Sequence, residues 1–191
     1  MSERVEAVPA EVEPAPEMQD GAGPEQHAAG ALAVPPEVSV VAGTPDGRRR
    51  AVAVVVSRFN GDITTRLLET AVEELQRCGV ARDRITVMPV PGAFELPLAA
   101  MALAKTRRFA CIVALGCVIR GETTHHELVA AEAASGLQLA ALETGVPVSF
   151  GVLTVDTQEQ AEARVERAAD AVRSALEMTT AFAELRAAAG G

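Results

Sequence analysis

The apolar positions of the chain form short continuous runs, and segments with helical spacing lie between them. Four of these runs are dominated by Val, Ile, Leu and Ala. A strand that is apolar on both faces needs a sheet that is covered on both sides. The pattern therefore predicts four strands, at residues 51–56, 85–90, 110–115 and 147–154, of which the first and third are expected to be buried.

The segments between the runs repeat apolar residues every three or four positions, which is the period of a helix with one buried face. In the first of these segments, Ile63, Leu67, Ala71 and Leu75 share such a face. We expect four helices, at about residues 63–79, 94–106, 124–143 and 157–188. The last of these is expected to be continuous.

Strands that alternate with helices of this length are joined by right-handed crossovers, so neighbouring strands are parallel. We predict one domain at residues 48–191, a three-layer α/β/α sandwich around a flavodoxin-like four-stranded parallel sheet in the order 2-1-3-4. Ligands of open parallel sheets bind beyond the carboxyl ends of the strands, where the winding direction reverses. The site is therefore expected among the loops at residues 57–61, 91–95 and 116–126.

These loops contain aromatic and acidic side chains at unusual positions. Phe59 and Phe94 are two of the five phenylalanines, and each follows a predicted strand. A planar heteroaromatic ligand could stack on such a ring, although either ring could equally cap the core. Glu95 stands in an otherwise apolar segment, where a carboxylate needs partners such as ligand hydroxyls or a helix N-terminus.

The third loop combines a predicted helix start with two histidines. Residues 121–124 read GETT, and the N–H groups and dipole of a helix start favour an anion such as phosphate. An ordinary threonine cap is the alternative. His125 and His126 follow, and an imidazole titrates near neutrality and can move protons in a condensation. Each could also be a histidine exposed at a helix start. The sequence has no zinc-ligand spacing and no G-x-S-x-G elbow, so no metal is expected.

Charge and composition divide the chain near residue 47. The formal charge is −9, and residues 1–47 carry nine acidic residues, one basic residue and seven of the eleven prolines. We expect this Pro/Ala/Glu-rich segment to be a disordered extension. The remainder is almost neutral, which disfavours nucleic acid as a partner. The cysteines form no C-x-x-C pair, and the chain has neither a membrane-spanning run nor a signal pattern. We therefore expect free thiols in a cytoplasmic protein without a membrane partner.

Four motifs, in order along residues 51–178, resemble those of the 6,7-dimethyl-8-ribityllumazine synthases of riboflavin biosynthesis. They are RFN at 58–60, VPGAFELP at 90–97, GCVIRGETTH at 116–125 and GVPVSFGVLT at 145–154. The resemblance implies a transferase that needs no cofactor. It would condense 5-amino-6-(D-ribitylamino)uracil with 3,4-dihydroxy-2-butanone 4-phosphate. It also implies a homo-oligomer, either a pentamer or a 60-subunit shell of twelve pentamers, with sites between subunits.

The resemblance implies a role for each matching residue. Phe59 would stack on the pyrimidinedione, Glu95 would accept ribityl hydroxyls, and His125 rather than His126 would transfer protons. Residues 121–123 would bind the phosphate with Arg164 of a neighbouring subunit. The implied substrate-binding residues are Phe59, Asn60, Ala93, Phe94, Glu95, Val118, Ile119, Gly121, Glu122 and Thr123, with Phe150 and Arg164 from the neighbour.

One departure from the family pattern concerns the segment after Arg164. Family members have a glycine-containing bend there with a lysine that contacts phosphate, whereas this chain is several residues shorter and has no lysine in that segment. Phosphate binding would be weaker unless Arg167 or Arg173 substitutes. Two hypotheses follow: an active synthase, or a related protein that acts as a shell or scaffold or on a related substrate.

Overall fold

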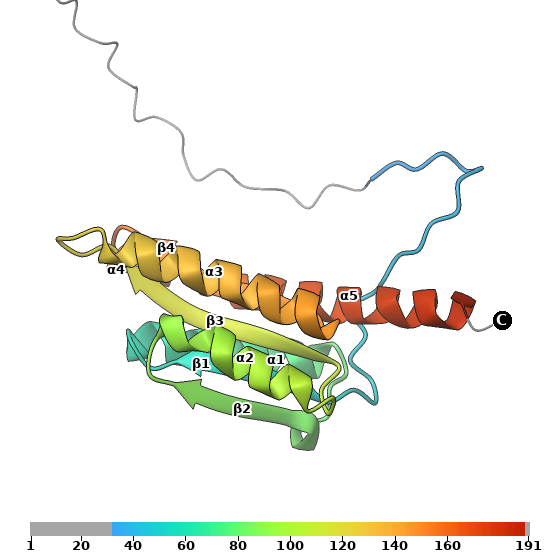
Figure 1. Cartoon of the computed structure of the whole chain (residues 1–191), viewed down its shortest axis with the longest axis horizontal. Coiled ribbons are helices and arrows are strands. Elements are labelled where there is room, and N and C mark those ends of the chain that lie inside the picture. The colour runs from blue at the N-terminus through green and yellow to red at the C-terminus, as the bar shows by residue number, and fades with distance from the viewer. Residues whose placement is uncertain (1–31, 190–191) are drawn as a thin grey trace, which may run out of the picture. The chain divides into compact units, whose positions relative to one another are not determined.

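Four parallel strands form the sheet of the computed structural model, which describes residues 32–189 (Figure 1). The sheet order is β2-β1-β3-β4, as predicted. Parallel register pairs Val54 of β1 with Val87 of β2 and with Val113 of β3. The strands are β1 (Val52–Ser57), β2 (Ile85–Val90), β3 (Cys111–Ile119) and β4 (Val148–Val155).

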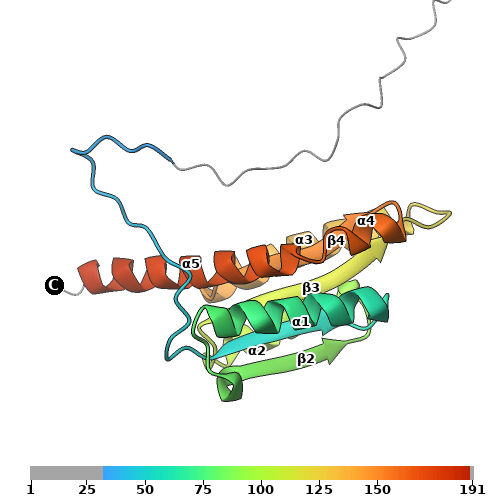
Figure 2. The same cartoon turned by 180° about the vertical axis from the view of Figure 1, so that it is seen from behind.

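Helices cover both faces of this sheet, so the predicted three-layer α/β/α sandwich is confirmed. On one face α1 and α5 pack with α4, and on the other α2 packs beside α3 (Figures 1 and 2). The helices are α1 (Gly61–Arg77), α2 (Leu96–Lys105), α3 (His125–Thr144), α4 (Gln158–Glu162) and α5 (Arg167–Ala189), with 3₁₀ turns η1 (Arg82–Arg84) and η2 (Ala93–Glu95).

The alternation of side chains along β1 explains why an almost wholly apolar run suits this position. Val52, Val54 and Val56 face α1 and α5, whereas Ala53 and Val55 face α2 and α3. Successive side chains of a strand point to opposite faces, so a central strand covered on both sides has no solvated position.

The prediction of one continuous C-terminal helix is wrong. Residues 163–166 form turns between α4 and α5, although Ala161, Val165 and Ala168 are all buried as their helical spacing suggested. The apolar period continues through the turn because the turn still packs on the sheet. A second difference is that β3 runs to Ile119, four residues beyond the predicted end. Gly116 lies inside this strand and pairs with Val152 of β4.

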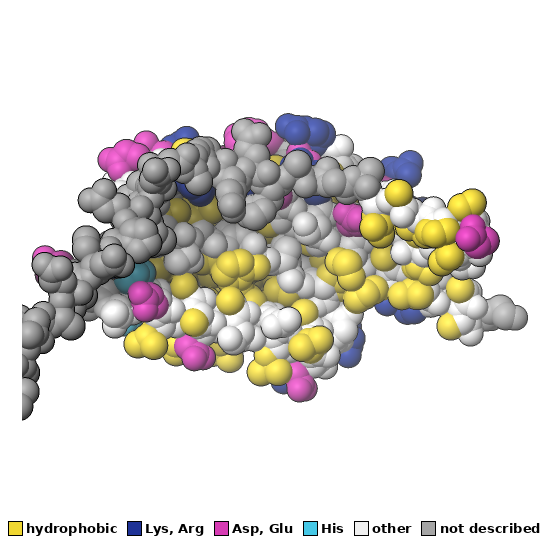
Figure 3. All heavy atoms as spheres, turned by 90° about the horizontal axis from the view of Figure 1, so that it is seen from above, with side chains coloured by type: hydrophobic (Ala, Val, Ile, Leu, Met, Phe, Trp, Pro, Cys, Tyr) yellow, Lys and Arg dark blue, Asp and Glu magenta, His cyan; other side chains and the backbone are white. Residues whose placement is uncertain are grey.

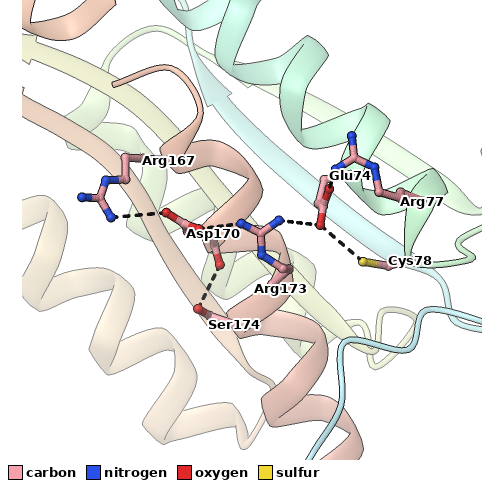
Figure 4. Close-up of polar contacts among 7 residues, drawn as sticks. All are labelled: Glu74, Arg77, Cys78, Arg167, Asp170, Arg173 and Ser174. Carbon is pink, nitrogen blue, oxygen red and sulfur yellow. Dashed lines mark hydrogen bonds and ion pairs between the residues drawn. The ribbon is translucent and has the colours of Figure 1, made fainter. Parts of the chain in front are cut away.

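A polar network joins α1 to α5 (Figure 4). Glu74 of α1 is 3% exposed, and its two carboxylate oxygens accept hydrogen bonds from Arg77 and Arg173, each at 2.7 Å. Arg173 also donates to Asp170 at 2.6 Å, and Arg167 reaches the other oxygen of Asp170 at 3.3 Å. Burying a carboxylate is unfavourable unless partners of this kind compensate for the lost hydration.

The predicted N-terminal extension is largely outside the described residues, which begin at 32. Its last residues contact the domain: the hydroxyl of Thr180 in α5 accepts a hydrogen bond from the Thr44 N–H at 2.7 Å. Gly47 then donates to the carbonyl of Cys78 at 2.7 Å. The disorder of residues 1–47 and the boundary at residue 48 remain predictions.

Candidate active site

The three predicted loops meet around one cavity of about 720 Å³ at the carboxyl ends of the strands. Its position is the reversal of winding between β1 and β3, where the fold rule places ligands. Ten of the thirteen predicted site residues line it: Phe59, Asn60, Ala93, Phe94, Glu95, Val118, Ile119, Gly121, Thr123 and His125.

Phe59 is held at the mouth of this cavity by the residues on either side of it. The Arg58 N–H donates to the Val90 carbonyl at 2.9 Å, which ties the chain just after β1 to the end of β2. Asn60 adopts a left-handed conformation (φ 55°), and its side-chain amide donates to the Cys117 carbonyl at 2.9 Å. The Phe59 side chain is 71% exposed, so it does not cap the core and its ring is free to stack.

Gly92 and Glu95 shape the second loop. The Gly92 N–H donates to Glu95 Oε2 at 2.8 Å across the 3₁₀ turn η2. A Cβ at Gly92 would lie 3.1 Å from both the Phe59 ring and this carboxylate. Among the described residues, Glu95 Oε1 has no hydrogen-bond partner, so this oxygen is available to a ligand hydroxyl. Phe94 is 61% exposed and likewise does not cap the core.

The third loop follows β3 and projects beyond the carboxyl ends of the strands (Figure 1). Its Arg120 N–H donates to the Val155 carbonyl at 2.9 Å, which anchors the start of the loop to β4. Thr124 precedes α3 but makes no side-chain capping hydrogen bond. The His125 N–H makes only a long contact to the Thr123 hydroxyl at 3.4 Å, and the Glu127 N–H donates to the Thr124 carbonyl at 3.0 Å. The start of the helix is therefore only partly satisfied, and a helix start of this kind attracts anions.

Both histidines line the cavity, but they differ in their exposure to solvent. His125 is exposed. The His126 side chain is only 11% exposed, and its Nδ1 lies 2.9 Å from the Thr123 carbonyl oxygen. The resemblance implied proton transfer by His125 rather than by His126, and so gave His126 no role.

Sequence reasoning also missed five further cavity residues, of which Gly92 lies in the second loop. Leu128, Val129 and Glu132 continue the face of α3 that begins at His125. Their spacing of three, four and seven positions is the helical signal that could have identified them. Cys117 also lines the cavity. Burial raises the pKa of its thiol to about 11, so it is not a nucleophile at neutral pH.

Three predicted site residues are not brought to the cavity of this single chain. Glu122 is exposed in the loop but does not line the cavity, and Phe150 lies exposed on the edge strand β4. Arg164 lies in the turn between α4 and α5, where its guanidinium donates to the Gln160 carbonyl at 2.9 Å. The resemblance had placed Phe150 and Arg164 in a neighbour's site, which a single chain does not contain.

Two further properties of the part of the chain that the structure describes concern metal ligands and membrane-spanning helices. Among residues 32–189, no group of three or more His, Cys, Asp or Glu side chains could hold a metal ion. In that part of the chain, no helix has both the length and the apolar character needed to cross a membrane.

A doubly wound α/β protein with aromatic, carboxylate and imidazole groups around one cavity has the features of an enzyme that acts on small molecules. The model of the 6,7-dimethyl-8-ribityllumazine synthase family matches residues 49–183. Synthases of this name from Yersinia pestis (strain Pestoides F) and Yersinia pseudotuberculosis (serotype O:1b, strain IP 31758) are each 49% identical over 144 residues, covering 72% of this chain and 90% of the relative. The chain belongs to this family. The prediction of a lumazine synthase, a transferase of riboflavin biosynthesis, is thereby confirmed.

Proposed function

We propose that the 720 Å³ cavity binds 5-amino-6-(D-ribitylamino)uracil beside 3,4-dihydroxy-2-butanone 4-phosphate and that the two condense there with loss of water and phosphate. The observation that supports this most is the convergence of three separate loops on one cavity, with an exposed Phe59, a free Glu95 oxygen and His125 on its wall. Each of these groups suits a different part of the two substrates.

The binding roles proposed for these groups are those that the resemblance to the family implies. Phe59 stacks on the pyrimidinedione, and the backbone of Val118 and Ile119 binds its polar edge. The turn formed by η2 lines the ribityl chain, with Glu95 accepting its hydroxyls. Gly121, Glu122 and Thr123 receive the phosphate at the start of α3.

Catalysis in this arrangement is mainly the holding of two small reactants in contact, with phosphate bound so that its departure needs little reorganisation. His125 transfers protons during the condensation, an effect of about 10²–10⁴-fold for a well-placed acid or base. Its exposure at the cavity wall leaves the ring free to reach a reactant.

We further propose that the working form is a homo-oligomer, a pentamer or a shell of twelve pentamers, in which Phe150 and Arg164 complete a neighbour's site. Figure 3 shows hydrophobic side chains spread over the face that includes α3 and α5. Leu139, Leu142 and Met178 are exposed there, and a second, largely apolar cavity of about 270 Å³ lies between α3, β4 and α5. Exposed apolar surface of this kind is typical of subunit interfaces.

Arg173 does not replace the missing lysine in this proposal, because Glu74 and Asp170 already neutralise its guanidinium. Within residues 32–189, Arg167 pairs only with Asp170, at 3.3 Å, and both side chains are half exposed. Among the described residues, Arg164 donates to the Gln160 carbonyl and has no carboxylate partner, so its guanidinium is left available to a phosphate. The free thiols Cys78, Cys111 and Cys117 suit a reducing compartment, and we place the reaction in the cytoplasm.

Steady-state kinetics with each substrate varied in turn test these roles. Phe59→Ala should raise KM for the ribitylaminouracil and leave KM for the butanone phosphate nearly unchanged, whereas Arg164→Ala should do the opposite. His125→Ala should lower kcat. A variant pattern in which both KM values rise together would contradict the assignment of separate subsites.

Mixed oligomers test the sharing of sites between subunits. Phe59→Ala chains and Arg164→Ala chains are unfolded together and refolded as a mixture. If each site takes Phe59 from one chain and Arg164 from its neighbour, some sites in the mixture are intact and activity rises above either variant alone. Refolding each variant by itself is the control, and a mixture no more active than their average would contradict the shared site. A wild-type protein that forms a large particle and binds ligand without turnover would instead support the scaffold.

A further inference from the structure

The two neighbouring histidines of the cavity wall differ in how firmly they are held. His126 is largely shielded from solvent, and its Nδ1 lies 2.9 Å from the carbonyl oxygen of Thr123. A carbonyl oxygen can only accept a hydrogen bond, so Nδ1 must carry the proton. The neutral ring is therefore fixed in the tautomer that carries its proton on Nδ1 rather than on Nε2.

The loop that His126 holds is tied to β4 at its start by the Arg120 N–H, which donates to the Val155 carbonyl at 2.9 Å, whereas the side-chain contacts of the loop are weaker. Arg120 pairs with Asp156 at 3.4 Å between exposed side chains, and solvent weakens such a pair. The Thr123 hydroxyl accepts from the His125 N–H at 3.4 Å, near the limit for a hydrogen bond. The shielded bond from His126 to the Thr123 carbonyl is shorter than either of these contacts.

Holding this carbonyl also orients the next backbone N–H. The peptide unit between Thr123 and Thr124 is planar and trans, so the Thr124 N–H points opposite to the Thr123 carbonyl. The bond therefore sets the direction of one of the first donors of α3. It also fixes the loop at Thr123, which lines the cavity.

We propose that His126 is a positioning residue for the anion-binding loop at residues 121–124: its Nδ1–H holds the Thr123 carbonyl and so pre-orients the loop for phosphate. This inference rests on the proposed function insofar as the phosphate is that of the second substrate. The role is distinct from that of His125, which touches the reactants.

The hydrogen bond persists whether or not His126 is charged, because Nδ1 carries a proton in both forms. The nearest carboxylate is that of Glu127, 4.0 Å from Nε2 and mostly exposed, while His125, Glu95 and Glu132 stand on the same cavity wall. Loss of His126 should therefore change phosphate affinity without moving the pH profile of kcat, which we expect to depend on His125.

Two substitutions separate the hydrogen bond from the volume of the ring. His126→Phe keeps a planar ring but removes the donor, whereas His126→Asn keeps an amide N–H in nearly the position of Nδ1. We expect His126→Phe to raise KM for the butanone phosphate and to weaken binding of inorganic phosphate by about threefold to tenfold, the usual effect of one neutral hydrogen bond. His126→Asn should restore most of the affinity, and KM for the ribitylaminouracil should not change in either variant.

Calorimetric titration with inorganic phosphate, made beside the kinetics, keeps this inference separate from the proposed function. Wild-type phosphate affinity in His126→Phe, equal losses in the Phe and Asn variants, or no phosphate binding to the wild-type protein would each overturn the role of His126. If the wild-type protein binds phosphate in the expected pattern but gives no turnover, the inference stands and the proposed function fails.

Discussion

The side-chain amide of Asn60 donates to the backbone carbonyl of Cys117 at 2.9 Å and so joins the loop after β1 to the end of β3. Asn60 makes this bond from a left-handed backbone conformation that few side chains adopt readily. Phe59 is the neighbouring residue, and we expect this link to hold its ring in place at the cavity. Asn60 therefore acts on the site through the position of Phe59, in addition to lining the cavity.

Asn60→Ala and Asn60→Gly should separate the two contributions of this residue. Both remove the amide, but only alanine adds left-handed strain, so Asn60→Ala should destabilise the protein by about 1–2 kcal/mol more than Asn60→Gly. Both should raise KM for the ribitylaminouracil, because Phe59 loses its anchor. Urea denaturation and kinetics measure the two effects. Equal stability of the two variants would argue against strain at this position.

Gly92 should be intolerant of a methyl group because of its two close neighbours. A Cβ there would lie 3.1 Å from Phe59 Cδ2 and from Glu95 Oε2, so Gly92→Ala should displace the ring and weaken binding of the ribitylaminouracil. Gly61→Ala is the matched control, since a Cβ at Gly61 meets nothing within 4 Å. Fluorescence titration with the lumazine product provides the affinity. Equal affinity in the two variants would contradict the packing of Phe59 on Gly92.

Glu74→Gln should destabilise the α1–α5 contact. The substitution leaves Arg77 and Arg173 without their charged partner, and we expect a loss of about 2–3 kcal/mol, below the range for a fully buried pair because both arginines reach solvent. Asp170→Asn, at a half-exposed position of the same network, should cost less than about 1 kcal/mol. Denaturation curves of the two variants test this order, and a reversed order would show that Asp170 rather than Glu74 holds the network.

Stability should fall in the alkaline range because of two buried thiols. Burial raises the pKa of Cys111 and of Cys117 from 9.0 to about 11. In the unfolded chain these thiols ionise near pH 9. Their stabilising contribution is therefore complete below about pH 9 and is lost as the pH rises towards about 11.

The sequence makes this alkaline range unusually easy to interpret, because it has no tyrosine and Lys105 is its single lysine. A variant with Cys111→Ala and Cys117→Ala should show a flatter dependence of the unfolding free energy on pH between 9 and 11, whatever its absolute stability. Denaturation at a series of pH values measures this slope. Burial also raises the pKa of the third thiol, Cys78, which is present in both proteins. An unchanged slope would mean that Cys111 and Cys117 are not the groups responsible.

The parts of the fold that could be predicted are those in which a local sequence pattern is compatible with only one structure. A valine-rich run such as that of β1 has to be covered on both faces, and its alternation with helices requires parallel strands. The turn at residues 163–166 could not be predicted, because Ala161, Val165 and Ala168 keep a helical period while the backbone between them turns. Burial alone does not distinguish a helix from a turn that packs on the same surface.

The candidate site likewise contains residues that could be predicted from the sequence and residues that could not. Phe59, Glu95 and His125 stood out because their residue types are unusual at strand ends and a helix start, and the structure brings them to one cavity. The role of His126 could not be read from the sequence, because it depends on which way one carbonyl points. Arg164 lies outside this cavity, and its part in a neighbouring subunit's site remains a proposal.

The rate of lumazine formation from the ribitylaminouracil and the butanone phosphate tests the central claim most directly. We predict that the wild-type protein gives a rate far above the spontaneous condensation and that His125→Ala lowers kcat, while the variant keeps its fold and its affinity for the product. A wild-type rate no higher than the spontaneous one, with product still bound, would contradict the account and favour a scaffold.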